Sequence, residues 1–89
     1  MKWSLKAKRS VEREIGDLPD EELRGEALTK IANLADDPFP SGAKKLRNAS
    51  GSLFRVRFGD YRIVYTVDQR IHEIEVIRVR HRKDVYRGL

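Results

Sequence analysis

The chain has 89 residues, which fits a single domain spanning residues 1–89, and its 19 Lys and Arg against 14 Asp and Glu give a net charge of +5. It contains no cysteine and only two histidines, so disulfides and thiolate metal sites are excluded and no structural zinc site is expected. Residues 1–6 lack the apolar stretch of a signal peptide, and no apolar run approaches the roughly 20 residues that a membrane span needs. We therefore expect a cytoplasmic domain with no membrane association and no metal or other cofactor.

Positive charge is concentrated in the second half of the chain. Residues 1–43 carry 7 Lys and Arg and 9 Asp and Glu, whereas residues 44–89 carry 12 and 5. Most of the basic residues in the second half are arginine, whose planar guanidinium group matches phosphate oxygens better than a lysine ammonium does. Charge alone leaves two interpretations open: a surface for nucleic acid, or a solvated basic surface that only keeps the protein soluble.

The predicted elements begin with a short strand at residues 2–6, where polarity alternates. Apolar residues spaced by four, at positions 7, 11 and 15, predict a first helix that ends at Gly16. A second helix follows as far as residue 35, with Pro19 in its first turn and an acidic run at the positive end of the helix dipole. We expect the two helices to be antiparallel.

The rest of the chain is predicted to form strands. Residues 37–52 contain Pro, Gly, Asn and Ser turn signals, and Lys44–Arg47 within them is either a short extended segment or a basic loop beside the sheet. Beyond residue 52 polarity alternates with a period of two, which predicts strands at residues 53–58, 61–67 and 73–80. The sum is an α+β fold of order β-α-α-β-β-β: a small, mostly antiparallel sheet with two helices packed on one face and an open basic face.

Strand alternation sends two arginines to the open face. Phe54, Val56 and Phe58 need burial against the helices, so Arg55 and Arg57 point the other way. Two positions along a strand lie roughly 7 Å apart, so both guanidinium groups reach neighbouring phosphates or two oxygens of one phosphate. The alternative is an ordinary solvated strand face.

Further cations are expected near these two arginines. Arg62 follows the tight turn at Gly59–Asp60 and is expected to lean over the preceding strand. In the last strand, alternation places Arg78 and Arg80 together, with Ile77 and Val79 on the opposite face. The side chains beyond the alternating pattern, which the chain can aim back at the sheet, are His81, Arg82 and Tyr86.

This collection of side chains suits RNA cleavage without a metal. The ribose 2′-OH must lose a proton, the charge that builds on the phosphoryl oxygens must be stabilised, and the departing 5′-oxygen must gain a proton. Preorganised arginines stabilise the charge, and a histidine or tyrosine transfers or orients a proton. Because arginine stays protonated, His81 and Tyr86 are the neutral-capable groups beside the cluster, whereas Tyr61 and Tyr65 are assigned to the core.

Three stretches resemble the RelE family of bacterial toxins. They are Lys45–Arg47, Phe54–Tyr65 with its Gly-Asp-Tyr-Arg-(apolar)₂-Tyr sequence, and Val79–Arg87 with its His-Arg-x-x-Val-Tyr sequence. The resemblance covers essentially the whole chain. It implies the toxin of a type II toxin–antitoxin module, a ribosome-dependent, metal-independent mRNA endonuclease that cuts mRNA in the A site and inhibits translation. It also implies a cognate RelB-like antitoxin that wraps the toxin and blocks the active face.

The resemblance, together with the basic segments, identifies candidate site residues. The predicted catalytic residues are Arg55, Arg57, Arg62, His81, Arg82 and Tyr86, and the predicted RNA-binding residues are Lys44, Lys45, Arg47, Arg78, Arg80 and Lys83. Two positions depart from the family. Arg55 stands where relatives often have a lysine able to act as a base, which moves that role toward His81 or Tyr86 or leaves it unfilled. Arg80 stands where many relatives have glycine, which adds charge and bulk beside the site.

Two other functions stay open. A ParE-like toxin shares this fold but inhibits DNA gyrase, and such toxins generally lack a complete arginine–histidine–tyrosine set, so the set here favours RNA. The other is a non-catalytic RNA-binding or partner-binding module of the same fold.

Overall fold

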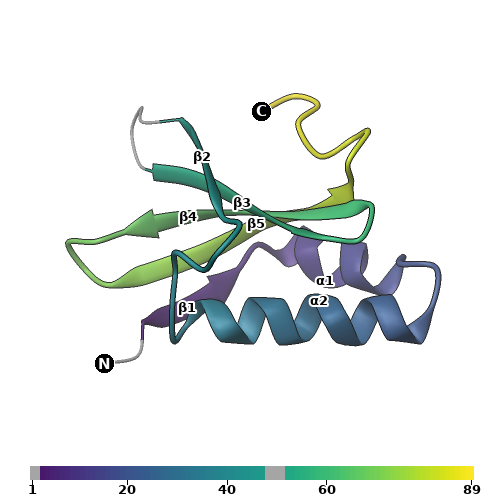
Figure 1. Ribbon diagram of the computed structural model, residues 1–89, viewed down its shortest axis with the longest axis horizontal. Helices are drawn as coiled ribbons and strands as arrows, with labels where there is room; N and C mark the ends of the chain where they lie inside the picture. Colours follow the sequence, from purple (N-terminus) through teal and green to yellow (C-terminus); the bar gives the residue numbers. More distant parts are fainter. Residues whose placement is uncertain (1–2, 48–51) are drawn as a thin grey trace.

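A computed structural model describes residues 3–47 and 52–89 of the chain as one five-stranded sheet and two helices (Figure 1). The elements are β1 (Ser4–Ala7), α1 (Arg9–Gly16), α2 (Glu21–Leu34), β2 (Lys44–Arg47), β3 (Ser52–Phe58), β4 (Tyr61–Asp68) and β5 (Glu73–His81). The sheet order is β1-β5-β4-β3-β2, and only the β1–β5 pair is parallel. The predicted α+β fold is confirmed. Residue 2 of the predicted first strand and the turn signals at residues 48–51 lie outside the described residues.

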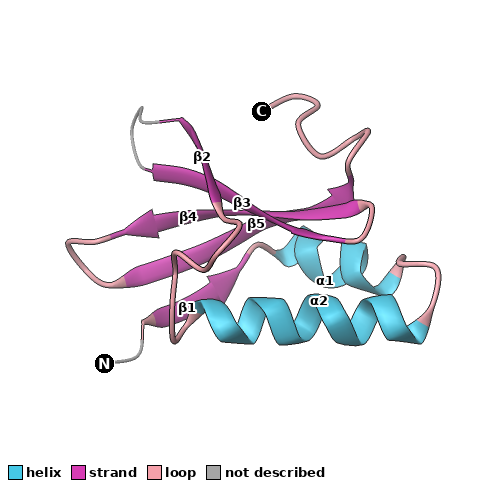
Figure 2. Ribbon diagram, in the orientation of Figure 1, coloured by secondary structure: helices cyan, strands magenta, loops and turns pink. Residues whose placement is uncertain are grey.

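Both helices lie on one face of the sheet, and the C-terminal segment lies on the opposite face (Figure 2). The main core fills the space between the helices and the sheet, and its largest fully buried side chains include Tyr65, Leu34, Ile63 and Ile74. The Tyr65 hydroxyl donates a 2.8 Å hydrogen bond to the Pro38 carbonyl, so the buried phenol is satisfied. Among the described residues, no helix is long and apolar enough to cross a membrane.

The start of α2 differs from the prediction. Asp20 is the N-cap residue, and its carboxylate accepts a 2.8 Å hydrogen bond from the Leu23 amide. Pro19 therefore precedes the helix instead of occupying its first turn. The helix starts after Asp20 because the Asp20 carboxylate can accept from a free amide of the first turn, which a proline side chain cannot do. Glu21 and Glu22 occupy the first turn, as expected from the helix dipole.

The segment Lys44–Arg47, for which strand and loop were both open, is a strand. It pairs antiparallel with β3, with Lys44 opposite Arg55 and Lys45 opposite Phe54. A register shift between residues 45 and 47 marks an irregularity in this short edge strand. The order of elements along the chain is therefore β-α-α-β-β-β-β, with one more strand than predicted.

A register shift also changes the faces of β5. Val64 pairs with Arg78 while the next residue, Tyr65, pairs with Val76, so Ile77 is the extra residue of a bulge. Ile77 packs with the small cluster on the face away from the helices, whereas Val79 packs in the main core. The prediction that these two residues share a face was wrong, because strict alternation fails at a bulge.

The face away from the helices carries a small apolar cluster of its own. Leu53 and Val64 from the sheet are covered by Val85 from the C-terminal segment, with Leu46 of β2 and Ile77 packed against them. Val85 is fully buried, although the surrounding tail is exposed. This cluster holds the tail over the sheet, and a space remains between the tail and the edge strand β2.

Candidate functional site

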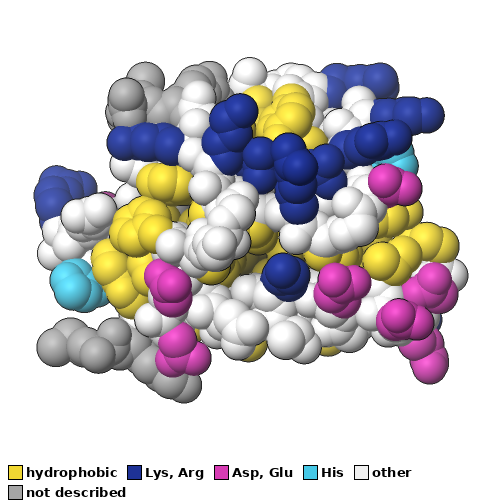
Figure 3. Space-filling model, in the orientation of Figure 1, with side chains coloured by type: hydrophobic (Ala, Val, Ile, Leu, Met, Phe, Trp, Pro, Cys, Tyr) yellow, Lys and Arg dark blue, Asp and Glu magenta, His cyan; other side chains and the backbone are white. Residues whose placement is uncertain are grey.

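The space between β2 and the C-terminal tail is an 840 Å³ cleft over the sheet. Its floor comes from β3 and β4, one wall from β2 and the other from the tail. Six of its ten lining side chains are cationic and none is Asp or Glu; the lining residues are Lys44, Leu46, Leu53, Arg55, Arg57, Arg62, Arg82, Lys83, Tyr86 and Leu89. Figure 3 shows the same separation at the surface, with lysine and arginine gathered over the side that carries β2 and the tail, and most acidic side chains on the side of the helices. The cleft therefore favours an anionic ligand.

Two arginines on the floor are held by backbone carbonyls. Arg55 is only 7% exposed, and its guanidinium group donates a 3.1 Å hydrogen bond to the Gly42 carbonyl in the loop before β2. Arg62 donates to the carbonyls of Gly59 and Tyr61, at 3.2 and 2.9 Å. A carbonyl orients a guanidinium group without cancelling its charge. Both groups are thus positioned in advance and can still attract a phosphate.

The tail supplies the opposite wall. Arg82 follows β5 directly, its amide donates to the Asp60 carbonyl at 2.8 Å, and its Nε lies 3.9 Å from the Asp60 carboxylate. Both side chains of this ion pair are more than half exposed, so water screens the interaction. Tyr86 is also exposed and lines the cleft one residue beyond the buried Val85.

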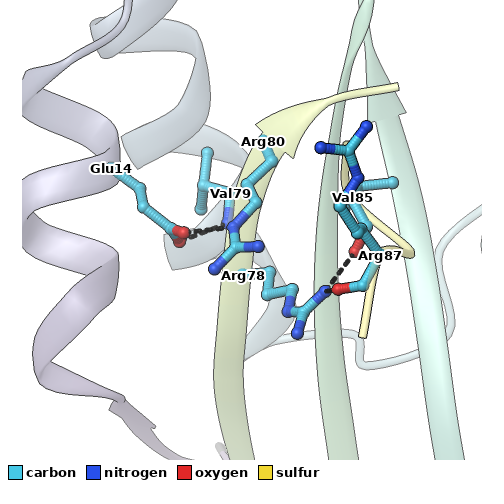
Figure 4. A network of polar contacts seen from close by, with 6 residues as sticks. All are labelled: Glu14, Arg78, Val79, Arg80, Val85 and Arg87. Carbon is cyan, nitrogen blue, oxygen red and sulfur yellow. Dashed lines mark hydrogen bonds and ion pairs between the residues drawn. The ribbon is translucent and has the colours of Figure 1, made fainter. Parts of the chain in front are cut away.

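Arg78 fastens the tail to the sheet (Figure 4). Its guanidinium group donates to the Val85 carbonyl at 3.0 Å and to the Arg87 carbonyl. Burial lowers the pKa of Arg78, and the positive charge of Arg80 lowers it further. Arg78 therefore acts on the cleft indirectly, by holding the segment that presents Arg82 and Tyr86.

Arg80 reaches away from the cleft to the first helix. Its Nε pairs with one carboxylate oxygen of Glu14 in α1, and the other oxygen accepts a 3.0 Å hydrogen bond from the Val79 amide (Figure 4). β1 pairs with β5 only as far as Val76, so the edge of β5 beyond it needs another partner. The Glu14 side chain, 9% exposed, satisfies that edge.

His81 is separated from the other predicted catalytic residues. It lines a different cavity of 200 Å³ together with Glu14, Asp17 and Asp84. Its ring packs edge-on against Tyr61 with the centroids 5.3 Å apart, and its Nδ1 accepts a hydrogen bond from the Lys83 amide. The structure thus brings together five of the six predicted catalytic side chains. Within the described part of the chain, Tyr86 is the neutral-capable group that lines the cleft.

The predicted RNA-binding residues divide in the same way. Lys44 and Lys83 line the cleft, whereas Lys45 points to the other face, with its ammonium 5.9 Å from the centre of the Phe54 ring. The side chain of Arg47 lies outside the described residues. Arg78 and Arg80 are committed to the tail and to α1, as described above.

Sequence reasoning missed the groups that arrange this site. The Gly42 carbonyl and the Glu14 carboxylate each position an arginine from a distant part of the chain. No local pattern marks either residue, because the partners are 13 and 66 residues apart. The position of Leu53 follows from alternation along β3, whereas the apolar wall at Leu46 follows only once β2 is known to pair with β3. Across residues 3–47 and 52–89, no group of three or more His, Cys, Asp or Glu is arranged to hold a metal ion.

Comparisons with known proteins place the chain in a family. Residues 1–86 match the family described as the ParE toxin of type II toxin-antitoxin system, parDE. Toxin RelG of Mycobacterium tuberculosis (strain ATCC 25618 / H37Rv) is 29% identical over 87 residues, which cover 98% of this chain and 99% of that protein. Toxin RelE of the same organism is 41% identical over 54 residues, or 61% of this chain and 55% of that protein.

A solved structure extends the likeness to three dimensions. The toxin chain in the archaeal RelE-RelB complex from Pyrococcus horikoshii OT3 superposes with a TM-score of 0.77 and 25% identity, covering 96% of this chain and all of that one. The resemblance that the sequence motifs indicated is confirmed. The chain belongs to the RelE/ParE family of toxins of type II toxin–antitoxin systems.

Proposed function

We propose that the protein is a ribosome-dependent, metal-independent mRNA endonuclease that cuts mRNA in the A site and inhibits translation. One observation carries this proposal: Arg55, Arg57, Arg62, Arg82 and Tyr86 line a single cleft that contains no Asp or Glu side chain. RNA cleavage by the 2′-OH builds negative charge on the phosphoryl oxygens, and fixed cations in a partly enclosed site stabilise that charge.

The residues have different roles in this proposal. Arg55 and Arg57 on β3 hold the phosphates that flank the scissile linkage. Arg62 and Arg82, on the floor and the facing wall, stabilise the charge on the scissile phosphoryl group. Tyr86 orients the reacting groups and takes part in proton transfer, since His81 lines a separate cavity.

Cleavage can be tested in a translating extract by mapping mRNA ends with primer extension. Breaks within A-site codons are expected with the wild-type protein. Arg62→Ala and Arg82→Ala should each reduce the cleavage rate by roughly 10²- to 10³-fold, the usual cost of removing one positioned charge-stabilising group. The matched control is Arg70→Ala, because Arg70 is an exposed arginine on the β4–β5 loop, paired with Asp68 and outside the cleft. Wild-type protein that leaves mRNA intact would overturn the proposal, and so would full activity of both cleft variants.

We also infer a cognate RelB-like antitoxin as partner. A similar toxin has been solved as a RelE-RelB complex, and an acidic amphipathic segment would complement the basic cleft. Co-expression with the neighbouring open reading frame, followed by size-exclusion chromatography, should give a complex in which cleavage is suppressed. A toxin that elutes free at every ratio would contradict this partner.

Inhibition of DNA gyrase is the second candidate function. It is favoured by the description of the matching family, which is that of the ParE toxin. A supercoiling assay with purified gyrase separates the two functions. Gyrase-dependent double-strand breaks without mRNA cleavage would establish this candidate in place of the nuclease.

A further inference from the structure

A second cavity, of 420 Å³, adjoins the cleft at the edge of β3. β2 pairs with β3 only up to Arg55, so residues 56–58 extend past the end of β2. The cavity opens at this place, and its lining residues are Lys30, Asn33, Leu34, Pro40, Ser41, Gly42, Arg55, Val56 and Arg57. Its volume lies within the range of about 300–1,000 Å³ that is usual for small-ligand pockets.

The second cavity and the cleft share two arginines. Arg55 and Arg57 line both of them, and Arg55 is tied to the Gly42 carbonyl at their boundary. An RNA strand whose phosphates lie on these two arginines therefore has the second cavity within reach of an adjacent nucleotide.

The second cavity carries groups for both parts of a nucleotide. Lys30, Arg55 and Arg57 give it positive charge, which attracts phosphates. Pro40 offers partly exposed apolar surface to a flat ring, whereas Leu34 and Val56 lie beneath it with 1% and 4% exposure. The Asn33 amide and the Ser41 hydroxyl offer both donors and acceptors to the edge of a base. Side-chain amides and hydroxyls are the groups that distinguish bases by their edges.

We propose that the second cavity is a base-binding subsite for the nucleotide next to the scissile linkage, and that Asn33 and Ser41 determine which base is preferred there. The inference rests on the proposed nuclease function and adds the source of its sequence preference. Arg55 and Arg57 bind the phosphates on either side, and the cavity reads the base between them.

The first test is the pattern of cleavage in a translating extract, read by primer extension over many codons. Asn33→Ala and Ser41→Ala should each reduce the discrimination between bases at one fixed position by roughly 3- to 10-fold, the effect of one hydrogen bond. Thr29→Ala is the control, because Thr29 is an exposed residue of the same helix outside the second cavity, and its cleavage pattern should match that of the wild type. Unchanged preferences in both cavity variants, with cleavage intact, would overturn the subsite while leaving the nuclease standing.

The second test does not depend on cleavage. The four ribonucleoside 5′-monophosphates are titrated into ¹⁵N-labelled protein, and amide shifts are recorded at residues 33 and 41 and in the cleft. Base-dependent shifts at the second cavity that disappear in Asn33→Ala support the subsite. Shifts confined to the cleft, and equal for all four bases, would refute it even if the protein proves to be a nuclease.

Discussion

Glu14 is expected to be a major determinant of stability, because it satisfies an unpaired strand edge and an arginine at the same time. One oxygen accepts from the Val79 amide at 3.0 Å, the other pairs with Arg80, and the side chain is 9% exposed. Glu14→Ala removes both contacts. It leaves a buried amide without a partner and a half-buried guanidinium group without its counter-ion.

The magnitude follows from these two losses. An unsatisfied buried amide costs about 1–3 kcal/mol, and loss of the charge partner adds to this. Arg80 keeps 34% side-chain exposure, so water compensates for part of the second loss. We therefore expect Glu14→Ala to lower the free energy of unfolding by about 2–4 kcal/mol, out of a total of roughly 4–13 kcal/mol for a domain of this length.

Urea unfolding of a double-mutant cycle measures the effect. The proteins are wild type, Glu14→Ala, Arg80→Ala and the double variant, and the coupling energy should be about 1–2 kcal/mol. Glu12→Ala, an exposed glutamate in the same helix, is the control and should change stability by less than about 0.5 kcal/mol. The reasoning is refuted if Glu14→Ala behaves like Glu12→Ala, or if the two substitutions at positions 14 and 80 are additive.

Three further predictions concern the tail, the core and the hairpin. Val85→Ala removes a fully buried anchor of the tail, so limited proteolysis should cut the C-terminal segment faster, with a loss of roughly 1–2 kcal/mol of local stability; cleavage as slow as in the wild type would count against the anchor. Burial, with a smaller contribution from Asp37, raises the pKa of Tyr65. The free energy of unfolding is therefore unaffected by this group below its unfolded pKa near 10, and it falls as the pH rises above that value. Between neutral pH and pH 11, the free energy of unfolding should fall by about 1 kcal/mol more in the wild type than in Tyr65→Phe. Equal shifts of the two urea midpoints would contradict this. Gly59 has a φ of +57° in the β3–β4 turn, so Gly59→Ala should cost about 1 kcal/mol in urea unfolding, and a neutral result would contradict the strain.

The arginines of the cleft floor could be predicted because a strand has a fixed period of two. Phe54, Val56 and Phe58 must be buried, and this requirement alone sends Arg55 and Arg57 to the other face. The same rule failed at Ile77, where a bulge inserts one residue and reverses the alternation. A bulge depends on how two strands fit each other, and neither strand encodes it alone.

Local periodicity and composition are enough to predict the fold class, the layer of helices, the basic face and the two strand arginines. Three features could not be predicted in this way: β2 is a strand, Val85 and Arg78 anchor the tail, and His81 and Arg80 turn away from the cleft. These features depend on contacts between elements that are separated in the chain. The position of a side chain beyond the last regular residue is fixed by whichever distant carbonyl, carboxylate or apolar cluster it meets.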